Sequence, residues 1–311
     1  MLSSAMRIGI DLGGTKTEGV ALDEAGNVLI RRRLPTPRED YSGTVEVVAG
    51  LVEAFERDLG RRGTVGVGIP GAVSPATDLI KNANSTWLLG TRLGEDLSAR
   101  LGRPVRLAND ADCFALSEAT DGAGAGAATV FGVIVGTGVG GGLVVHGRLL
   151  SGPNAIAGEW GHNPLPALRL DGVETEWPGP PCYCGRTGCI ETFLSGPGLA
   201  RDYHAATGRS LVAESIVRDA EEGDAAAEAC LARYEDRMAR ALASIINVLD
   251  PHVIVLGGGL SNVSRLYRNV PERWGRYVFS DTVTTRLVPP AHGDASGVRG
   301  AAWLWDRFSA P

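Results

Sequence analysis

Three cysteines lie within eight residues in the stretch CYCGRTGCIE, in a chain that contains only two others. Cys182, Cys184 and Cys189 form a C-x-C-x4-C pattern, and Glu191 follows two residues after the last cysteine. A disulfide between Cys182 and Cys184 would be strained and would leave an odd thiol. A structural zinc ion takes four ligands in a tetrahedron, commonly three cysteines and one histidine. The spacing therefore favours zinc, with His162 as the obvious fourth ligand, over a disulfide or coincidence.

Three glycine-rich turns follow apolar, strand-like segments and form a second set of residues suited to chemistry. Glycine permits positive φ and lets backbone N–H groups approach an anion without a Cβ in the way. A plain tight turn explains any single one of them, but the three together indicate phosphate binding. The predicted nucleotide-binding residues are Asp11, Gly13, Gly14, Thr15, Lys16, Gly136, Thr137, Gly138, Gly257, Gly258 and Gly259.

The first of these turns, DLGGTK, is followed by a second strand. A P-loop or a dinucleotide-binding turn would be followed by a helix, so the pattern indicates phosphates held between two hairpins. The hydroxyls of Thr15 and Thr137 can donate to phosphate oxygens, and Asp11 suits Mg²⁺, bound through water.

Asn109 and Asp110, in LANDADCFA, lie at a predicted strand-to-helix junction. Asn and Asp are favoured helix N-caps, which is the structural alternative to any chemical role. Transfer of a phosphoryl group to a hydroxyl needs a proton acceptor beside the attacking oxygen, and Asp110 is our candidate for that base.

The elements that must position these residues alternate between strands and helices, which is typical of an α/β layer structure. Residues 7–33 read as strand, glycine turn, strand, turn and strand, and residues 129–150 repeat that order, which indicates a duplicated fold. The other predicted elements are helices at 41–59, 93–102 and 111–119, strands at 64–71, 104–110 and 251–259, an irregular segment at 151–181, a helical region at 198–249 and a C-terminal helix.

Length and composition narrow the class of protein. A chain of 311 residues exceeds the usual size of a single core, so two lobes are expected. Its 44% hydrophobic and 21% charged residues are typical of a soluble globular protein, without a membrane span or secretory leader. The net charge of −6 and the lack of a basic run argue against nucleic acid and membrane as partners. We expect a cytoplasmic protein, in which the cysteines stay reduced.

The chain resembles the ROK family of sugar kinases and repressors, within the superfamily that has the actin-like, hexokinase-like ATPase fold. The resemblance rests on DLGGTK, GTGVGGG, GEWGH, CYCGRTGCIE and VIVLGGGLSN. KNANSTWLLG and GEWGHNPLP are most similar to the bacterial fructokinase/mannokinase branch. The resemblance implies two duplicated RNase H-like lobes with an interdomain cleft. These are residues 1–112, completed by a helix at about 293–311, and residues 113–292 with the zinc loop.

The same resemblance implies roles for individual residues. It implies ATP with Mg²⁺ as substrate and cofactor, structural Zn²⁺ on His162 and the three clustered cysteines, and a homodimer. The implied sugar-binding residues are Asn84, Asn109, Asp110, Glu159, His162 and Glu191. We expect an ATP-dependent fructokinase that phosphorylates the 6-hydroxyl of D-fructose. The alternatives are mannose, glucose or N-acetylglucosamine as the acceptor, and, more distantly, a sugar-sensing repressor, for whose DNA-binding segment MLSSA leaves no room.

Overall fold

The computed structural model describes residues 6–166, 169–170, 173–174, 176 and 178–307. Residues 1–5 and the last residues of the predicted C-terminal helix lie outside the described residues. The chain forms two compact units, unit 1 (Met1–Ala128, Gly142–Ala157 and Ala291–Pro311) and unit 2 (Thr129–Gly141 and Gly158–Pro290). Internal contacts define these units, whereas functional lobes are defined by relative movement. The lobe boundaries at 112 and 292 therefore stay a prediction.

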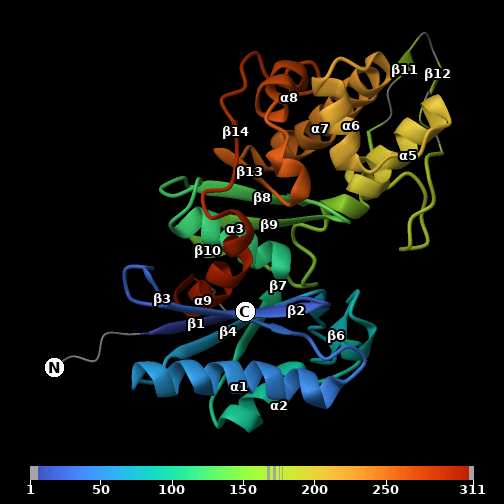
Figure 1. Cartoon of the computed structure of the whole chain (residues 1–311). Helices are drawn as coiled ribbons and strands as arrows, with labels where there is room; N and C mark the ends of the chain where they lie inside the picture. The colour runs from blue at the N-terminus through green and yellow to red at the C-terminus, as the bar shows by residue number, and fades with distance from the viewer. Residues whose placement is uncertain (1–5, 167–168, 171–172, 175, 177, 308–311) are drawn as a thin grey trace. The chain divides into compact units, whose positions relative to one another are not determined.

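Unit 1 contains a five-stranded sheet in the order β3-β2-β1-β4-β7 (Figure 1). Its strands are β1 Arg7–Leu12, β2 Lys16–Leu22, β3 Val28–Pro35, β4 Thr64–Ile69 and β7 Arg106–Asn109. The first three pair antiparallel, while β4 is parallel to β1 and to β7. The register places Asp11 opposite Glu18 and Glu18 opposite Arg33, so these three side chains share one row across the sheet.

Helices cover both faces of this sheet (Figure 1). They are α1 Tyr41–Leu59 and α2 Leu93–Leu101 on one face, and α3 Asp110–Thr120 and α9 Ser296–Arg307 on the other. The predicted helix at 41–59 is confirmed with both ends. The Asp40 side chain accepts from the backbone N–H of Gly43 at its start, and Gly60 ends it in the left-handed conformation. Buried Ile8, Val67 and Phe55 pack in one hydrophobic core.

Short elements after β4 complete this unit. The hairpin of β5 Ala72–Val73 and β6 Ile80–Lys81 precedes the 3-10 turn η1 Thr86–Leu88. This stretch contains NANSTW, and it brings Ser85 against the first glycine turn, because a Cβ at Gly14 would lie 3.4 Å from the Ser85 hydroxyl.

The second sheet repeats the strand order of the first, as β10-β9-β8-β13-β14. Its strands are β8 Thr129–Val135, β9 Val139–Val145, β10 Arg148–Leu149, β13 Val253–Gly257 and β14 Arg286–Val288. β13 is parallel to β8 and β14, as β4 is to β1 and β7. The predicted duplication is therefore confirmed, and each copy carries a glycine turn between its first two strands.

Unit 2 contains β8, the first residues of β9, β13 and β14, and it is otherwise mainly helical. The helices are α4 Ile190–Leu194, α5 Gly196–Thr207, α6 Ala213–Glu221, α7 Ala225–Leu249 and α8 Leu266–Trp274, with 3-10 turns η2 Trp160–His162 and η3 Gly259–Asn262. The segment predicted as irregular contains η2 and a small hairpin, β11 Arg169–Leu170 with β12 Val173–Glu174. Among the described residues, no helix combines the length and apolar character that a membrane span requires.

Helices α3 and α9 approach each other closely at Gly300, and this contact fixes the helix that begins at Asp110. A Cβ at position 300 would lie 1.7 Å from the backbone oxygen of Cys113. We expect Gly300→Ala to lower the free energy of unfolding by about 3 kcal/mol or more, because the helices must separate. Urea denaturation measures this change.

The matched control is Gly50→Ala on α1, where an added Cβ meets nothing within 4 Å. Because Gly50 lies inside a helix, this change is expected to raise stability by about 0.5–1 kcal/mol. Equal stability of the wild type and Gly300→Ala would contradict the close approach of the two helices.

Candidate functional site

One histidine and three cysteines converge in unit 2. The ligand atoms of His162, Cys182, Cys184 and Cys189 all lie within 4.8 Å of one another. The Cys184 and Cys189 sulfurs are 3.7 Å apart, and the Cys182 sulfur is 3.6 Å from His162 Nδ1. All five cysteines of the chain are free thiols, so the disulfide alternative finds no support in this geometry.

These distances fit a tetrahedral metal. Zinc–sulfur bonds of about 2.3 Å and zinc–nitrogen bonds of about 2.0 Å require edges of roughly 3.6–3.8 Å between ligand atoms. Metal ligation also requires thiolates. Hydrogen bonds, first from the Arg186 backbone, lower the pKa of the Cys184 thiol to about 6. Burial raises the pKa of Cys189 to about 12, and a bound cation would offset that burial cost.

Glycines shape the backbone that presents the cysteines. Gly185 and Gly188 have φ of 87° and 70°, in the left-handed region where other residues are strained. The N–H of Cys182 donates to the Arg186 oxygen, and the N–H of Gly188 donates to the Pro180 oxygen. These turns fold CYCGRTGC into a compact knuckle, so the glycines are part of the motif.

Glu191 lies between the cysteine cluster and the second glycine turn. Its Oε2 accepts a hydrogen bond from the backbone N–H of Val139 at 3.0 Å, and its Oε1 is 4.0 Å from the Cys182 sulfur. A Cβ at Gly138 would lie 2.6 Å from Glu191 Oε2. Glycine at 138 therefore leaves the space that this carboxylate occupies.

The remaining predicted residues of unit 2 lie at strand ends and turns, where Gly257 is buried and Gly258 and Gly259 are exposed. Thr137 and Glu159 are exposed, and the Gly136 oxygen accepts from the N–H of Gly196 at the start of α5. At the third glycine turn, Gly258 has φ of 81°, and a Cβ there would lie 2.4 Å from the Val135 oxygen. Only glycine fits there, beside the end of β8.

Tyr183 lies between two of the cysteines and was not predicted to be functional. Its hydroxyl is 3.0 Å from His162 Nε2, and the two rings meet edge to face with centroids 5.2 Å apart. An aromatic residue inside a cysteine motif carries no periodicity that would have identified this contact.

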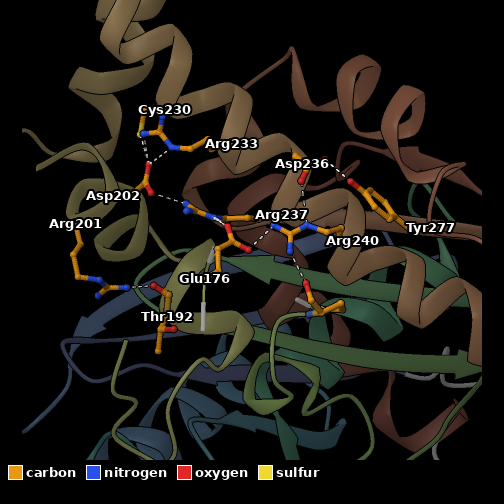
Figure 2. Close-up of polar contacts among 11 residues, drawn as sticks. Glu176, Thr192, Arg201, Asp202, Cys230, Arg233, Asp236, Arg237, Arg240 and Tyr277 are labelled. Carbon is orange, nitrogen blue, oxygen red and sulfur yellow. Dashed lines mark hydrogen bonds and ion pairs between the residues drawn. The ribbon is translucent and has the colours of Figure 1, made fainter. Parts of the chain in front are cut away.

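The long segment between His162 and Cys182 is tied to α7 (Figure 2). Glu176 forms ion pairs with Arg237 at 2.6 Å and with Arg240 at 2.7 Å, and all three side chains are largely buried. Arg240 also donates to the Pro166 oxygen. Two arginines three residues apart on a mostly apolar helix are the sequence signal that could have identified this attachment.

Arg237 links this segment to two further elements of unit 2. It pairs with Asp202 of α5 at 2.8 Å and lies over the ring of Phe193 on α4, 5.3 Å from the ring centroid. Because α4 also carries Glu191, the ion-pair network supports the helix that positions this carboxylate (Figure 2).

In unit 1 the first glycine turn is closed by its own backbone. The N–H of Gly13 donates to the Lys16 oxygen at 3.0 Å, and the Thr36 hydroxyl donates to the Gly13 oxygen at 2.8 Å. Gly14, Thr15 and Lys16 are exposed, as a phosphate-binding turn requires.

Asp11 precedes this turn in a setting that disfavours its charge. Burial, followed by the nearby Asp110 and Glu18 carboxylates, raises the pKa of Asp11 to about 7, although Arg33 acts in the opposite direction. The first turn of α9 is adjacent, since a Cβ at Gly297 would lie 3.5 Å from Asp11 Oδ2. A divalent cation beside Asp11 and Asp110 would relieve this repulsion, and oxygen donors suit Mg²⁺.

Asn109 and Asp110 lie at the end of β7 and the start of α3. Asn109 Oδ1 accepts from the backbone N–H of Ala111 as the N-cap of α3, and Asn109 Nδ2 donates to the Gly71 oxygen. The amide therefore keeps one N–H for a ligand. Asp110 is exposed at the helix start, and Asn84 is exposed in the NANSTW turn.

The predicted residues thus form one set in each unit. Unit 1 brings the first glycine turn, Asp11 and Asp110 into one neighbourhood, and unit 2 joins the cysteine cluster, Glu191 and the second glycine turn. Asn109 caps α3 through its Oδ1, and this capping contact is compatible with ligand binding through its amide nitrogen.

The duplicated sheets, each with a glycine turn, have the actin-like, hexokinase-like ATPase fold. The structure resembles a ROK hexokinase from Thermus thermophilus with a TM-score of 0.83 and 33% identity, covering 96% of both chains. It also resembles a ROK glucokinase from Streptomyces griseus, solved with glucose and AMPPNP, with a TM-score of 0.76 and 26% identity, covering 96% of this chain and 99% of that one.

The sequence comparisons define the family. The ROK family profile matches residues 7–307, so the chain belongs to the ROK family. An N-acetyl-D-glucosamine kinase from Yersinia enterocolitica is 41% identical over 299 residues, which cover 96% of this chain and 99% of that protein.

The cluster geometry predicts one tightly bound zinc per chain. We expect elemental analysis of the purified protein to find about one zinc, and Cys184→Ser to lose most of it, because three ligands hold the ion less tightly than four. Cys113→Ala, a buried thiol in unit 1, should keep its zinc. A stoichiometric disulfide without metal would contradict the prediction.

Proposed function

We propose that the protein is an ATP-dependent hexose kinase whose acceptor is N-acetyl-D-glucosamine. The main support is the 41% identity to the N-acetyl-D-glucosamine kinase from Yersinia enterocolitica, which extends over nearly the full length of both chains. The glycine turns and the exposed aspartate at the start of α3 support a kinase. The fructose specificity suggested by the motif resemblance is not confirmed, and the comparisons favour the N-acetylglucosamine alternative.

In the proposed reaction the 6-hydroxyl oxygen of the sugar attacks the γ-phosphorus of ATP. The bond to the β-phosphate bridging oxygen breaks, which yields ADP and the sugar 6-phosphate, and the hydroxyl proton passes to Asp110. Asp110 can take this proton late, so it needs no strongly raised pKa. The free N–H of Asn109 is available to orient a sugar hydroxyl.

The negative charge of the ATP phosphates would be stabilised by the glycine turns and by a magnesium ion near Asp11. The N–H groups of the glycine turns and the hydroxyls of Thr15 and Thr137 would contact phosphate oxygens. Asp11 would hold Mg²⁺ through water, and the ion supplies charge neutralisation during phosphoryl transfer.

We assign the cysteine cluster to structural Zn²⁺. His162, Cys182, Cys184 and Cys189 would supply four ligands, the number that a structural zinc ion takes, so no position would remain for chemistry at the ion. The ion would brace the knuckle, so that His162 and Glu191 are held as sugar ligands together with Glu159. The homodimer and the cytoplasmic setting implied by the resemblance stay predictions.

The acceptor is tested with a panel of hexoses. We expect kcat/KM for N-acetyl-D-glucosamine to exceed the values for fructose, glucose and mannose by about tenfold or more, because an acetyl-binding pocket discriminates by about 1–3 kcal/mol. A coupled assay for ADP release measures all four sugars. A higher value for fructose would overturn this acceptor while leaving the kinase proposal intact.

The base is tested with Asp110→Asn. We expect kcat to fall by about 10²- to 10⁴-fold, because the proton acceptor is lost, with a much smaller change in KM for the sugar. The control is Asp58→Asn, which removes an exposed partner of Arg32 and should leave kcat unchanged. Near-normal turnover in Asp110→Asn would reject this residue as the base.

A further inference from the structure

The Tyr183 hydroxyl and the proposed sugar hydroxyl would both accept a hydrogen bond from the same nitrogen of His162. The proposed function assigns the outward nitrogen of this imidazole to a sugar hydroxyl, and the inference below rests on that assignment. In the structure Nε2 is already 3.0 Å from the hydroxyl of Tyr183. The other ring nitrogen, Nδ1, faces the Cys182 sulfur at 3.6 Å.

Zinc binding would decide which nitrogen carries the proton. With Nδ1 bound to the proposed ion, Nε2 would be the N–H donor and the Tyr183 oxygen would accept from it. An imidazole N–H makes one well-aligned hydrogen bond. A sugar hydroxyl can therefore accept from Nε2 only if the Tyr183 hydroxyl leaves.

The Tyr183 side chain can move away from His162 at a small cost in free energy. Its side chain is 73% exposed, although it is a large aromatic residue inside a tight turn. Its hydroxyl lies 3.0 Å from His162 Nε2, and His162 belongs to the proposed sugar site, which places the phenol at that site as well.

We propose that Tyr183 is a positioning residue that occupies the His162 Nε2 donor until a hexose hydroxyl replaces it. In the free protein its hydroxyl satisfies the N–H and its ring edge orients the imidazole. On sugar binding the phenol turns toward solvent and the donor passes to the substrate. Tyr183 thereby sets sugar affinity without taking part in phosphoryl transfer.

The test compares Tyr183→Phe with the wild-type protein. Phenylalanine keeps the edge-to-face contact and removes the competing oxygen. Because a typical hydrogen bond contributes modestly net of water, we expect the sugar Kd, measured by calorimetry without nucleotide, to fall by about two- to fivefold. KM should fall by a similar factor, with kcat within about twofold of wild type and the zinc content unchanged.

Tyr183→Ala supplies a second measurement, because it removes both the hydroxyl and the ring. We expect it to bind sugar less tightly than Tyr183→Phe, since the imidazole loses the contact that orients it. The matched control is Tyr41→Phe, which removes a phenol hydroxyl that donates to Asp96 in unit 1 and should leave Kd unchanged.

An unchanged or higher Kd in Tyr183→Phe would overturn the proposal, and the higher value would make the hydroxyl a direct sugar ligand. Loss of zinc in Tyr183→Phe would also overturn it by assigning the hydroxyl a structural role. Failure of the proposed function is distinguishable. If the wild type prefers another hexose, the same comparison is made with that sugar, because the inference does not depend on which hexose supplies the hydroxyl.

Discussion

The convergence of one imidazole and three thiols is the constraint on which the site of unit 2 depends. These four groups come from two stretches of chain separated by a long segment, and each would be costly to hold close to the others without a shared partner. Two of the distances between them, 3.6 Å from Cys182 to His162 and 3.7 Å from Cys184 to Cys189, match the edges that a zinc tetrahedron would have. Once the four are fixed, the start of α4 follows directly from Cys189, and Glu191 is held at one position.

The predicted site of unit 1 depends on the electrostatic interactions among neighbouring carboxylates and one arginine. Asp11, Glu18 and Arg33 occupy one row of the sheet, and Asp110 adds a further negative charge near Asp11. The raised pKa of Asp11 means that the folded protein retains this proton up to about pH 7, where an unfolded chain would have lost it near pH 4. Ionised Asp11 therefore opposes folding, and a bound cation would reverse that effect.

Much of the architecture could be predicted from the sequence, because hydrophobic period and glycine turns are local signals. The helix at 41–59, the repeated strand order and the cluster of one histidine and three cysteines all depend on such signals. The contacts of Tyr183 and Glu176 could not be predicted. Each is made by a side chain in an irregular segment with a group distant in sequence, and no spacing rule identifies such partners. The choice of hexose was equally inaccessible, because hexoses differ in single hydroxyl orientations or one substituent.

The carboxylate of Glu191 fills the space left by the missing side chain of Gly138 and accepts from the N–H of Val139. The backbone turn and this acid are therefore in direct contact. Under the proposed function, the acid would bind sugar and the turn would bind nucleotide, so a ligand that orders this contact would raise the affinity for the other ligand. The factor would be the same in either order of binding.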